Sequence, residues 1–225
     1  MRFRKPELIP VLFILCATAL LSALGAWQLV RLGWKETLIN TVSAAQSMPQ
    51  LEKLPESLDG LAYRSAVVRG TFANDKALRL VGRKKDMRAG FFVLTPLVLE
   101  DGRAILVNRG YAEEGHENPA AGRQEIHGVL RPPREKRPFT PDNDVQKNLW
   151  FYEDMAAISA TTGLTLLPLV VEATGKGKKN LQPIPSDGKI TLRNDHLGYA
   201  VTWFSLALIG LIMFGFYYRE PQNKA

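Results

Sequence analysis

Two long runs without a charged side chain lie toward the two ends of this 225-residue chain. The first extends over Leu8–Val30 and the second over Leu197–Tyr218. Each run reaches the roughly 20 residues that an α-helix needs to cross about 30 Å of hydrocarbon. We therefore expect transmembrane helices over 9–30 and 197–218, which bracket a central domain over 31–196.

Both runs have an alternative interpretation. The first follows three basic residues, and the segment 23–25 resembles a small-residue cleavage site, as in a secretory signal peptide. Its apolar stretch is longer than the roughly 7 to 15 residues of such peptides, however, and it continues through Trp27. The second run could be a core helix only inside a large core, but it ends at Tyr217, Tyr218 and Arg219, which are typical of a membrane interface.

Basic residues flank the outer ends of both runs, at the start of the chain and at Arg219 and Lys224. The positive-inside rule then predicts that the termini, 1–8 and 219–225, are cytoplasmic. The central domain is therefore expected on the outer side of the membrane. Because the single cysteine, Cys16, lies within the first run, no disulfide is expected to hold this domain.

The central domain is expected to be mostly antiparallel β-structure with one short helix, an α+β arrangement. Runs of β-branched and aromatic residues predict strands over 63–72, 77–81, 124–130, 150–152 and 169–172. A hairpin is predicted over 91–112, where Asp101-Gly102 favours a type I′ turn. A helix is predicted over 153–162, ended by Gly163, and the first helix is expected to continue over 34–45.

Catalytic motifs are absent from the sequence: it contains no Cys-x-x-Cys, Gly-x-Ser-x-Gly or His-Glu-x-x-His and no glycine-rich phosphate loop. No enzymatic activity is therefore expected. Basic stretches over 82–85, 131–137 and 175–179 are predicted to be exposed loops. Contact with anionic lipid headgroups or an acidic protein is their alternative role, and nucleic acid is not an expected partner outside the membrane.

The chain has three histidines. His116 lies in a polar loop and is expected to be a solvated side chain. His127 lies on a short strand with no second histidine or cysteine at ligand spacing, so it is expected to be structural. His196 lies where a polar segment meets the second apolar run. A neutral imidazole there can ligate the iron of an amphipathic haem. The alternative is an interfacial polar residue behind a helix cap formed by Asn194 or Asp195.

Three stretches resemble one protein family. The segments "GAWQLVRLGWKETLI" (25–39) and "RNDHLGYAVTWFSLA" (193–207) are similar to the signatures that end the first span and open the second in the surfeit locus protein 1 family. The segment "LVNRGYA" (106–112) is similar to its Arg-Gly-aromatic strand, with Tyr111 where Trp is more usual. The matching positions include Trp27, Gln28, Arg31, Trp34, Lys35, Arg109, Gly110, Asp195 and Tyr199.

The resemblance implies a non-enzymatic assembly factor for cytochrome c oxidase. It implies that the protein binds haem a, with His196 as an axial ligand of the iron, and assists haem insertion into the largest oxidase subunit. That subunit, haem a synthase and the lipid bilayer are the implied partners. From the residues themselves we add that Arg193 or Arg31 pairs with a haem propionate.

Small residues four positions apart in the first run, at 19 and 23 and at 22 and 26, allow close approach of another helix. That helix could belong to a docked partner or could be the second span of the same chain.

Two other classes stay open. A regulator of envelope polysaccharide length shares the two-span layout, although its outer region should be rich in long helices. A membrane-anchored enzyme would place its site near Arg109 and Tyr111, or near Asp154. No nucleophile–base pair is visible at either place.

Overall fold

The computed structural model describes residues 7–81, 90–175, 183–188, 190 and 192–219. The chain divides into two compact units, a helical unit of residues 1–41 with 191–225 and a β-rich domain of residues 42–190. The basic residues before position 7, the loop predicted over 82–85 and most of that over 175–179 lie outside the described residues.

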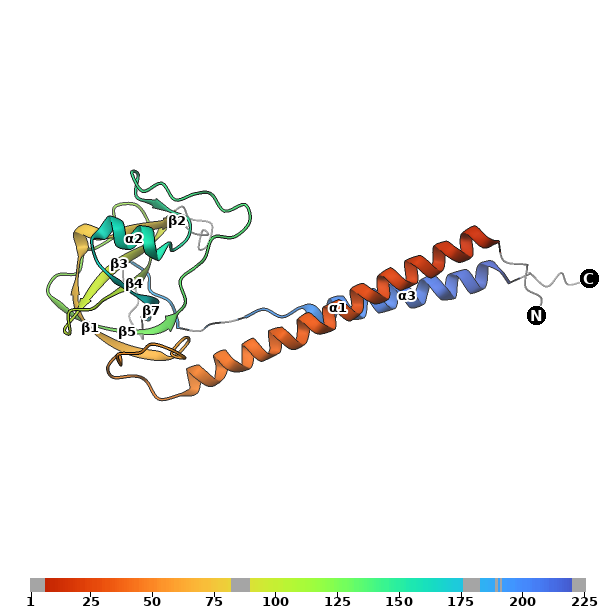
Figure 1. Cartoon of the computed structure of the whole chain (residues 1–225), viewed down its shortest axis with the longest axis horizontal. Coiled ribbons are helices and arrows are strands. Elements are labelled where there is room, and N and C mark those ends of the chain that lie inside the picture. Colours follow the sequence, from red (N-terminus) through yellow and green to blue (C-terminus); the bar gives the residue numbers. More distant parts are fainter. Residues whose placement is uncertain (1–6, 82–89, 176–182, 189, 191, 220–225) are drawn as a thin grey trace, which may run out of the picture. The chain divides into compact units, whose positions relative to one another are not determined.

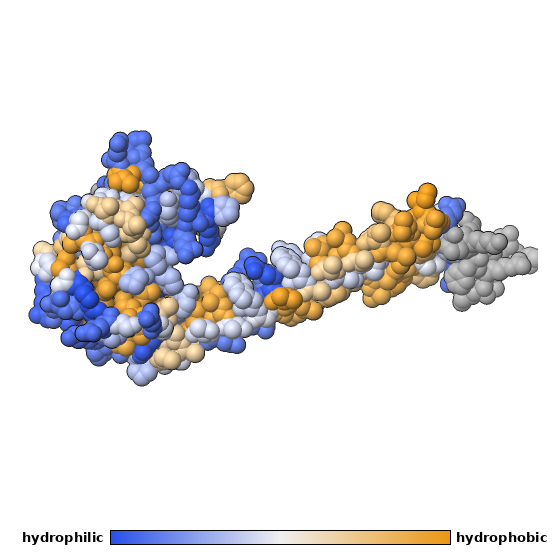
Figure 2. Space-filling view, viewed as in Figure 1, coloured by the Kyte–Doolittle hydropathy of each residue, from blue (hydrophilic) through white to orange (hydrophobic). Residues whose placement is uncertain are grey.

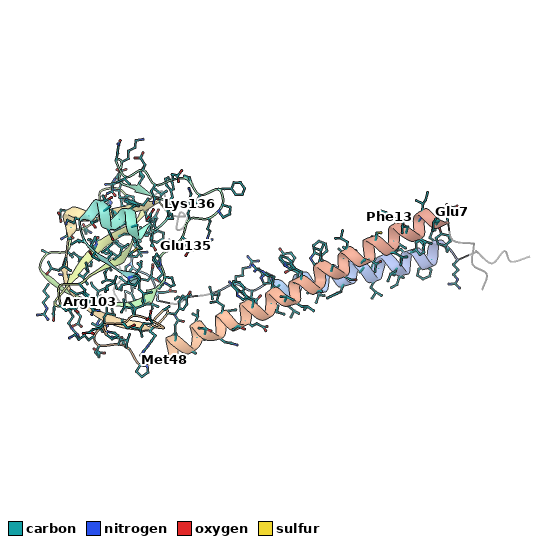
Figure 3. The ribbon with its side chains drawn as sticks, viewed as in Figure 1. Glu7, Phe13, Met48, Arg103, Glu135 and Lys136 are labelled. Atoms are coloured by element: carbon teal, nitrogen blue, oxygen red, sulfur yellow. The ribbon has the colours of Figure 1, made fainter. Side chains whose placement is uncertain are left out.

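Two long helices account for the apolar runs (Figure 1). Helix α1 covers Leu8–Ser47 and α3 covers His196–Tyr217, and both are long and apolar enough to cross a membrane. Only 6% and 11% of their most apolar 18-residue stretches are buried, unlike the core helix of a soluble protein. Phe13, for example, projects from α1 and is 73% exposed (Figure 3). The expected pair of apolar helices is confirmed, and α1 includes the predicted continuation over 34–45.

Figure 2 shows apolar side chains gathered along this helix pair. The two helices run in opposite directions and approach closely at Gly25 of α1. A Cβ atom there would lie 2.8 Å from the ring of Phe204, so the contact depends on glycine. Near the other end of the pair, the Glu7 N–H donates to the Tyr218 hydroxyl at 3.3 Å.

The small residues singled out in the first run take little part in this contact. Ala19, Ala23 and Ala26 are exposed, and Ser22 is partly buried. Packing against α3 therefore runs through Gly25, and the three alanines leave a small-residue surface uncovered.

The β-rich domain is built on one seven-stranded sheet in the order β1-β5-β7-β4-β3-β2-β6. Its strands are β1 (Ser65–Phe72), β2 (Leu78–Val81), β3 (Phe91–Leu99), β4 (Ala104–Ala112), β5 (Arg123–Arg131), β6 (Leu149–Trp150) and β7 (Leu166–Ala173). A further pairing of β1 with β3 closes the first five strands of this order into a barrel. The named strands pair antiparallel except in β4–β7 and β2–β6, which confirms the α+β expectation.

Side chains from all five barrel strands meet in the interior. They include Ala66, Val68, Phe72, Leu97, Leu99, Ile105, Val107, Leu130, Leu169 and Val171. A second cluster lies on the outer face of β4 and β7, where Leu106 and Val170 pack with Trp150 and Ile158. Strand β4 is buried on both faces, which explains why its apolar residues are continuous and not alternating.

Helix α2 covers Met155–Thr162 and supplies Ile158 to the outer cluster. Its N-cap is Asp154, whose side chain accepts a hydrogen bond from the Ala157 N–H at 3.0 Å. It ends at Gly163, which has φ +67°. These are the usual start and stop residues of a helix. Asp154, a candidate for an enzymatic site, therefore has a structural role.

The turn between β3 and β4 differs from the type I′ prediction. A type I′ turn needs positive φ at both central residues, but of Asp101 and Gly102 only Gly102 has it, at +83°. The Gly102 N–H donates to the Leu99 carbonyl at 3.1 Å, and the Leu99 N–H donates to the Arg103 carbonyl at 2.8 Å. The loop is therefore a three-residue connection closed by a glycine bulge.

Candidate functional site

Among the described residues, one hydrogen bond between side chains joins α1 and α3. His196 is the first residue of α3 and is partly buried, whereas Gln28 on α1 is only 9% exposed. The distance between His196 Nδ1 and Gln28 Oε1 is 2.7 Å. Because an amide oxygen only accepts, Nδ1 carries the hydrogen and donates it. The lone pair of the neutral ring then lies on Nε2, which bonds to none of the described residues.

This contact explains why an amide is present in the first apolar run. A buried amide without a partner costs free energy, and His196 supplies the partner. Gln28 is the only amide side chain between Leu8 and Val30. Gln28 is one of the family positions in the sequence, but its role as the partner of His196 was not predicted. The rarity of an amide in that run was the signal that could have revealed it.

Arg31 lies three residues after Gln28, so the two are neighbours on the surface of α1. Its guanidinium carbon is 4.9 Å from the Trp34 ring centroid and 6.0 Å from that of Trp27. Both tryptophans are more than half exposed. Lys35 follows one turn after Arg31. In the described part of the chain, Arg31 has no carboxylate partner, so its charge remains available to an anion.

Arg193, unlike Arg31, is paired with a carboxylate. Its side chain is 87% exposed and its Nε forms an ion pair with Asp195. Asp195 occupies the N-cap position of α3 but makes no side-chain capping bond, because its carboxylate is paired with Arg193. Asn194 Oδ1 is buried and has no hydrogen-bond partner among the described residues. Asp195 is therefore the N-cap residue, as the alternative interpretation of His196 has it, but neither its side chain nor that of Asn194 makes a capping hydrogen bond. Tyr199, one turn into α3, is 55% exposed.

The remaining motif positions, Arg109 and Gly110, belong to β4 in the β-rich domain and not to the helical unit. Gly110 has φ +120°, and a Cβ atom there would collide with the Ile184 carbonyl, so only glycine fits. The aromatic residue of the motif, Tyr111, is buried and packs edge-on against Phe92 at 5.7 Å. This motif therefore serves the barrel, where Arg109 lines a separate cleft.

Neither of the other two histidines belongs to a metal-ligand cluster among the described residues. His127 Nε2 lies 3.3 Å from Glu125 Oε1, and His116 is an exposed loop residue. Within the described ranges, no three His, Cys, Asp or Glu side chains cluster to hold a metal ion. A single histidine with one free ring nitrogen suits an iron that a macrocycle already holds, whereas a structural zinc ion needs about four ligands.

Known proteins similar to this chain cover both of its units. A profile of the SURF1 family matches residues 15–208. "Surfeit locus protein 1" of Takifugu rubripes is 34% identical over 220 residues, covering 86% of this chain and 90% of that protein. The "SURF1-like protein" of Rickettsia conorii is 33% identical over 211 residues (89% and 88%). "Surfeit locus protein 1" of Homo sapiens is 32% identical over 223 residues (88% and 73%).

Proposed function

The chain belongs to the SURF1 family, and on that premise we propose that it is a cytochrome c oxidase assembly factor. In this proposal it binds haem a and assists its insertion into the largest subunit of the oxidase, without making or breaking a covalent bond. The observation that supports haem binding most directly is the free Nε2 of His196, which Gln28 fixes through the opposite ring nitrogen.

The residues around His196 suit an amphipathic ligand. When bound, haem a supplies an iron that accepts the His196 Nε2 lone pair, a macrocycle and tail that favour apolar surroundings, and two propionates. The hydrogen bond from Nδ1 to Gln28 fixes the ring tautomer and raises its basicity, as outer partners of metal-binding histidines do. Arg31 is the better partner for a propionate, because Arg193 would first have to leave Asp195.

We also propose a location and a set of partners for this protein. We place the protein in the bacterial inner membrane, with both termini in the cytoplasm and the β-rich domain in the periplasm, because basic residues flank the outer ends of both helices. Its partners would be the largest oxidase subunit and haem a synthase. The rival polysaccharide regulator is disfavoured, because the domain between the spans contains strands and an eight-residue helix where long helices were expected.

An absorption spectrum tests the proposal. The full-length protein is purified in detergent from a host that makes haem a, in parallel with His196→Ala. His116→Ala is the matched control, because His116 is an exposed loop residue outside the helical unit. We expect a haem a spectrum in the parent and in His116→Ala, and its loss in His196→Ala. Arg31→Ala should retain less haem than Arg193→Ala.

Two results would contradict this assignment. If the folded parent carries no haem a under these conditions, haem binding is wrong and any role in oxidase assembly must depend on protein contacts alone. If His196→Ala retains an unchanged spectrum, the ligand is a different residue.

A further inference from the structure

The β-barrel has a cleft at one of its ends, with a volume of about 640 Å³. Its apolar wall includes Phe72, which belongs to the interior core, and Ile126 and Ala173, which pack against that core. Gln124 of β5 and Pro185 also line the cleft. The volume falls within the range of small-molecule sites, and barrel mouths are common positions for them.

Arg109 brings a positive charge into this cleft. Ile105 and Val107, four and two residues earlier on β4, belong to the interior core, and the contact of Arg109 with the interior residue Phe72 places it on the same face. Its guanidinium donates to the backbone carbonyls of Glu117 and Asn118 and lies 5.1 Å from the Phe72 ring centroid. These partners hold the side chain in place without neutralising it.

In the described part of the chain, no carboxylate pairs with Arg109. The acidic side chain that lines the cleft, Glu125, is bound to Arg69 Nε at 2.7 Å. Burial lowers the pKa of Arg109 below its ordinary value, in keeping with a half-buried charge that lacks a counter-ion.

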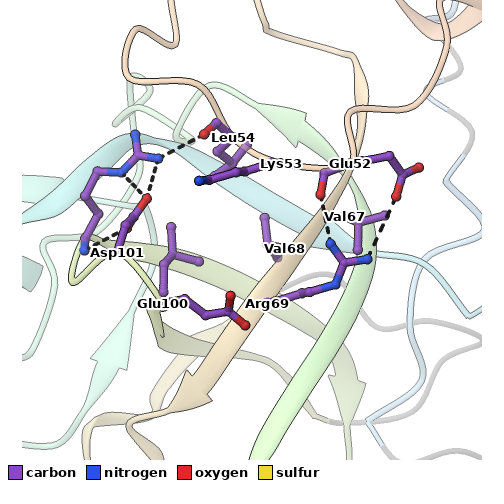
Figure 4. A pocket seen from close by; sticks show the side chains of 10 residues that line it. Glu52, Lys53, Leu54, Val67, Val68, Arg69, Glu100 and Asp101 are labelled. Atoms are coloured by element: carbon purple, nitrogen blue, oxygen red, sulfur yellow. Dashed lines mark hydrogen bonds and ion pairs between the residues drawn. The ribbon is translucent and has the colours of Figure 1, made fainter.

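Other arginines of the barrel, unlike Arg109, pair with carboxylates. A second hollow lies beside Val67 and Val68 (Figure 4). There, Arg69 pairs with Glu52, and Arg103 Nη2 lies 2.7 Å from Asp101 Oδ2. The arginines of that hollow are thus neutralised by the protein itself, whereas Arg109 is not.

We propose that the barrel mouth is a binding site for a carboxylate attached to an apolar group. The guanidinium of Arg109 would pair with the carboxylate, and the apolar body would lie against Ile126, Ala173 and Pro185. The carboxylate could belong to a free acid or to the C-terminus of a peptide. This site is independent of the proposed haem site, because its residues lie in the other unit.

The test uses 4-fluorobenzoate as the probe and 4-fluorobenzyl alcohol as its neutral analogue. Binding to the full-length protein in nonionic detergent is followed by fluorine NMR line broadening. We expect the acid to bind at least tenfold more tightly than the alcohol. Arg109→Gln should remove this preference and Arg109→Lys should retain part of it. Arg134→Gln is the matched control, because Arg134 lies over the Phe92 ring at 5.2 Å and outside the cleft.

A second variant keeps Arg109 in place. Gln124→Glu puts a carboxylate into the cleft at nearly constant size, so it should compete with the probe and weaken binding at least tenfold. Short acetylated peptides with a free or an amidated C-terminus separate the two sources of the carboxylate. Tighter binding of the free-acid peptide than of fluorobenzoate assigns the site to chain termini, and the reverse assigns it to free acids. Absence of probe binding, or equal binding to Arg109→Gln and parent, would overturn the proposal.

Discussion

Buried polar side chains are used in different ways by the β-rich domain and by the helical unit. In the domain, Arg131 is 12% exposed and makes two bonds to Glu153, at 2.6 and 2.7 Å, and a third to Glu172 at 2.8 Å. Glu172 also accepts a bond from Asn108 at 2.9 Å. Burial alone would lower the pKa of Arg131, but the two carboxylates outweigh it, so that pKa lies above its ordinary value.

The helical unit shows the opposite pattern. Gln28 and His196 make one bond to each other, and the second ring nitrogen of His196 bonds to no described residue. A network whose donors and acceptors are all used inside the protein stabilises the fold but offers nothing to a ligand. A histidine that uses only one of its two ring nitrogens adds less to stability, but its other nitrogen is available for coordination. Under the proposed function, this difference separates polar groups that stabilise the fold from polar groups that bind a ligand, and each of the following variants tests one side of it.

The largest effect is expected at Glu153, whose side chain is fully buried. Glu153→Ala leaves Arg131 buried with one of its two carboxylates missing, which should lower the free energy of unfolding by about 3–5 kcal/mol. Urea unfolding of the full-length protein in detergent, followed by tryptophan fluorescence, measures the change. Glu125→Ala is the control, because it breaks an exposed ion pair with Arg69 and should change stability little. Similar losses of unfolding free energy in the two variants would show that the buried network stabilises the domain no more than an exposed ion pair does.

On the other side of the comparison, Gln28→Leu should affect ligation more than stability. Without the amide oxygen, His196 loses the bond that fixes its tautomer, and loss of such an outer partner typically weakens ligation by about 10–100-fold. Haem a retention during dialysis of the loaded protein measures this effect. Gln46→Leu is the control on the same helix, because Gln46 bonds to the Gly188 carbonyl and not to His196. Equal retention by the two variants would show that Gln28 does not position the histidine.

Local patterns predicted much of the fold. The hairpin over 91–112, the helix before Gly163 and both apolar helices follow from residue periodicity and from stop signals. The closure of the barrel through β1 and β3 and the parallel pairing of β4 with β7 could not be predicted in this way. Those pairings depend on the registers of segments far apart in the chain, which composition does not encode.

The candidate site was predictable to a similar extent. His196 stood out because it lies where polar and apolar sequence meet. Its partner Gln28 is 168 positions earlier in the chain, and only the packing of two helices brings them together. The Asp101-Gly102 turn shows the same limit on a smaller scale. The position of the turn at this glycine was predicted correctly, but the turn type depends on how β3 and β4 pair beyond it.

A smaller effect is expected from separating the two helices. Gly25→Leu places a side chain against the Phe204 ring and should destabilise the helix pair by about 1–3 kcal/mol through overpacking. Denaturation of the detergent-solubilised protein with an anionic detergent measures the change. Gly33→Leu is the matched control, because a Cβ atom at Gly33 meets nothing within 4 Å. Adding Phe204→Ala should restore part of the stability lost in Gly25→Leu. If it does not, the overpacking does not involve the Phe204 ring.

The smallest effect concerns the exposed hairpin turn and depends on pH. Hydrogen bonds from the Arg103 side chain hold the pKa of Asp101 below its ordinary value. A carboxylate with a lowered pKa in the folded state contributes stability above its unfolded pKa, about 4, and this contribution disappears as pH falls through the folded value. The difference in unfolding free energy between the parent and Asp101→Asn should therefore be constant above about pH 5 and shrink at lower pH.

The Arg103→Gln background identifies the cause of this pH dependence. The Arg103 guanidinium donates to Asp101 at 2.7 and 2.9 Å, while a separate bond comes from the Arg103 backbone N–H at 3.1 Å. Without the guanidinium, the acid-sensitive part of the difference should become smaller, and the part due to the backbone bond should remain. If Asp101→Asn shows the same pH dependence in both backgrounds, the turn is stabilised by its backbone geometry and not by this ion pair.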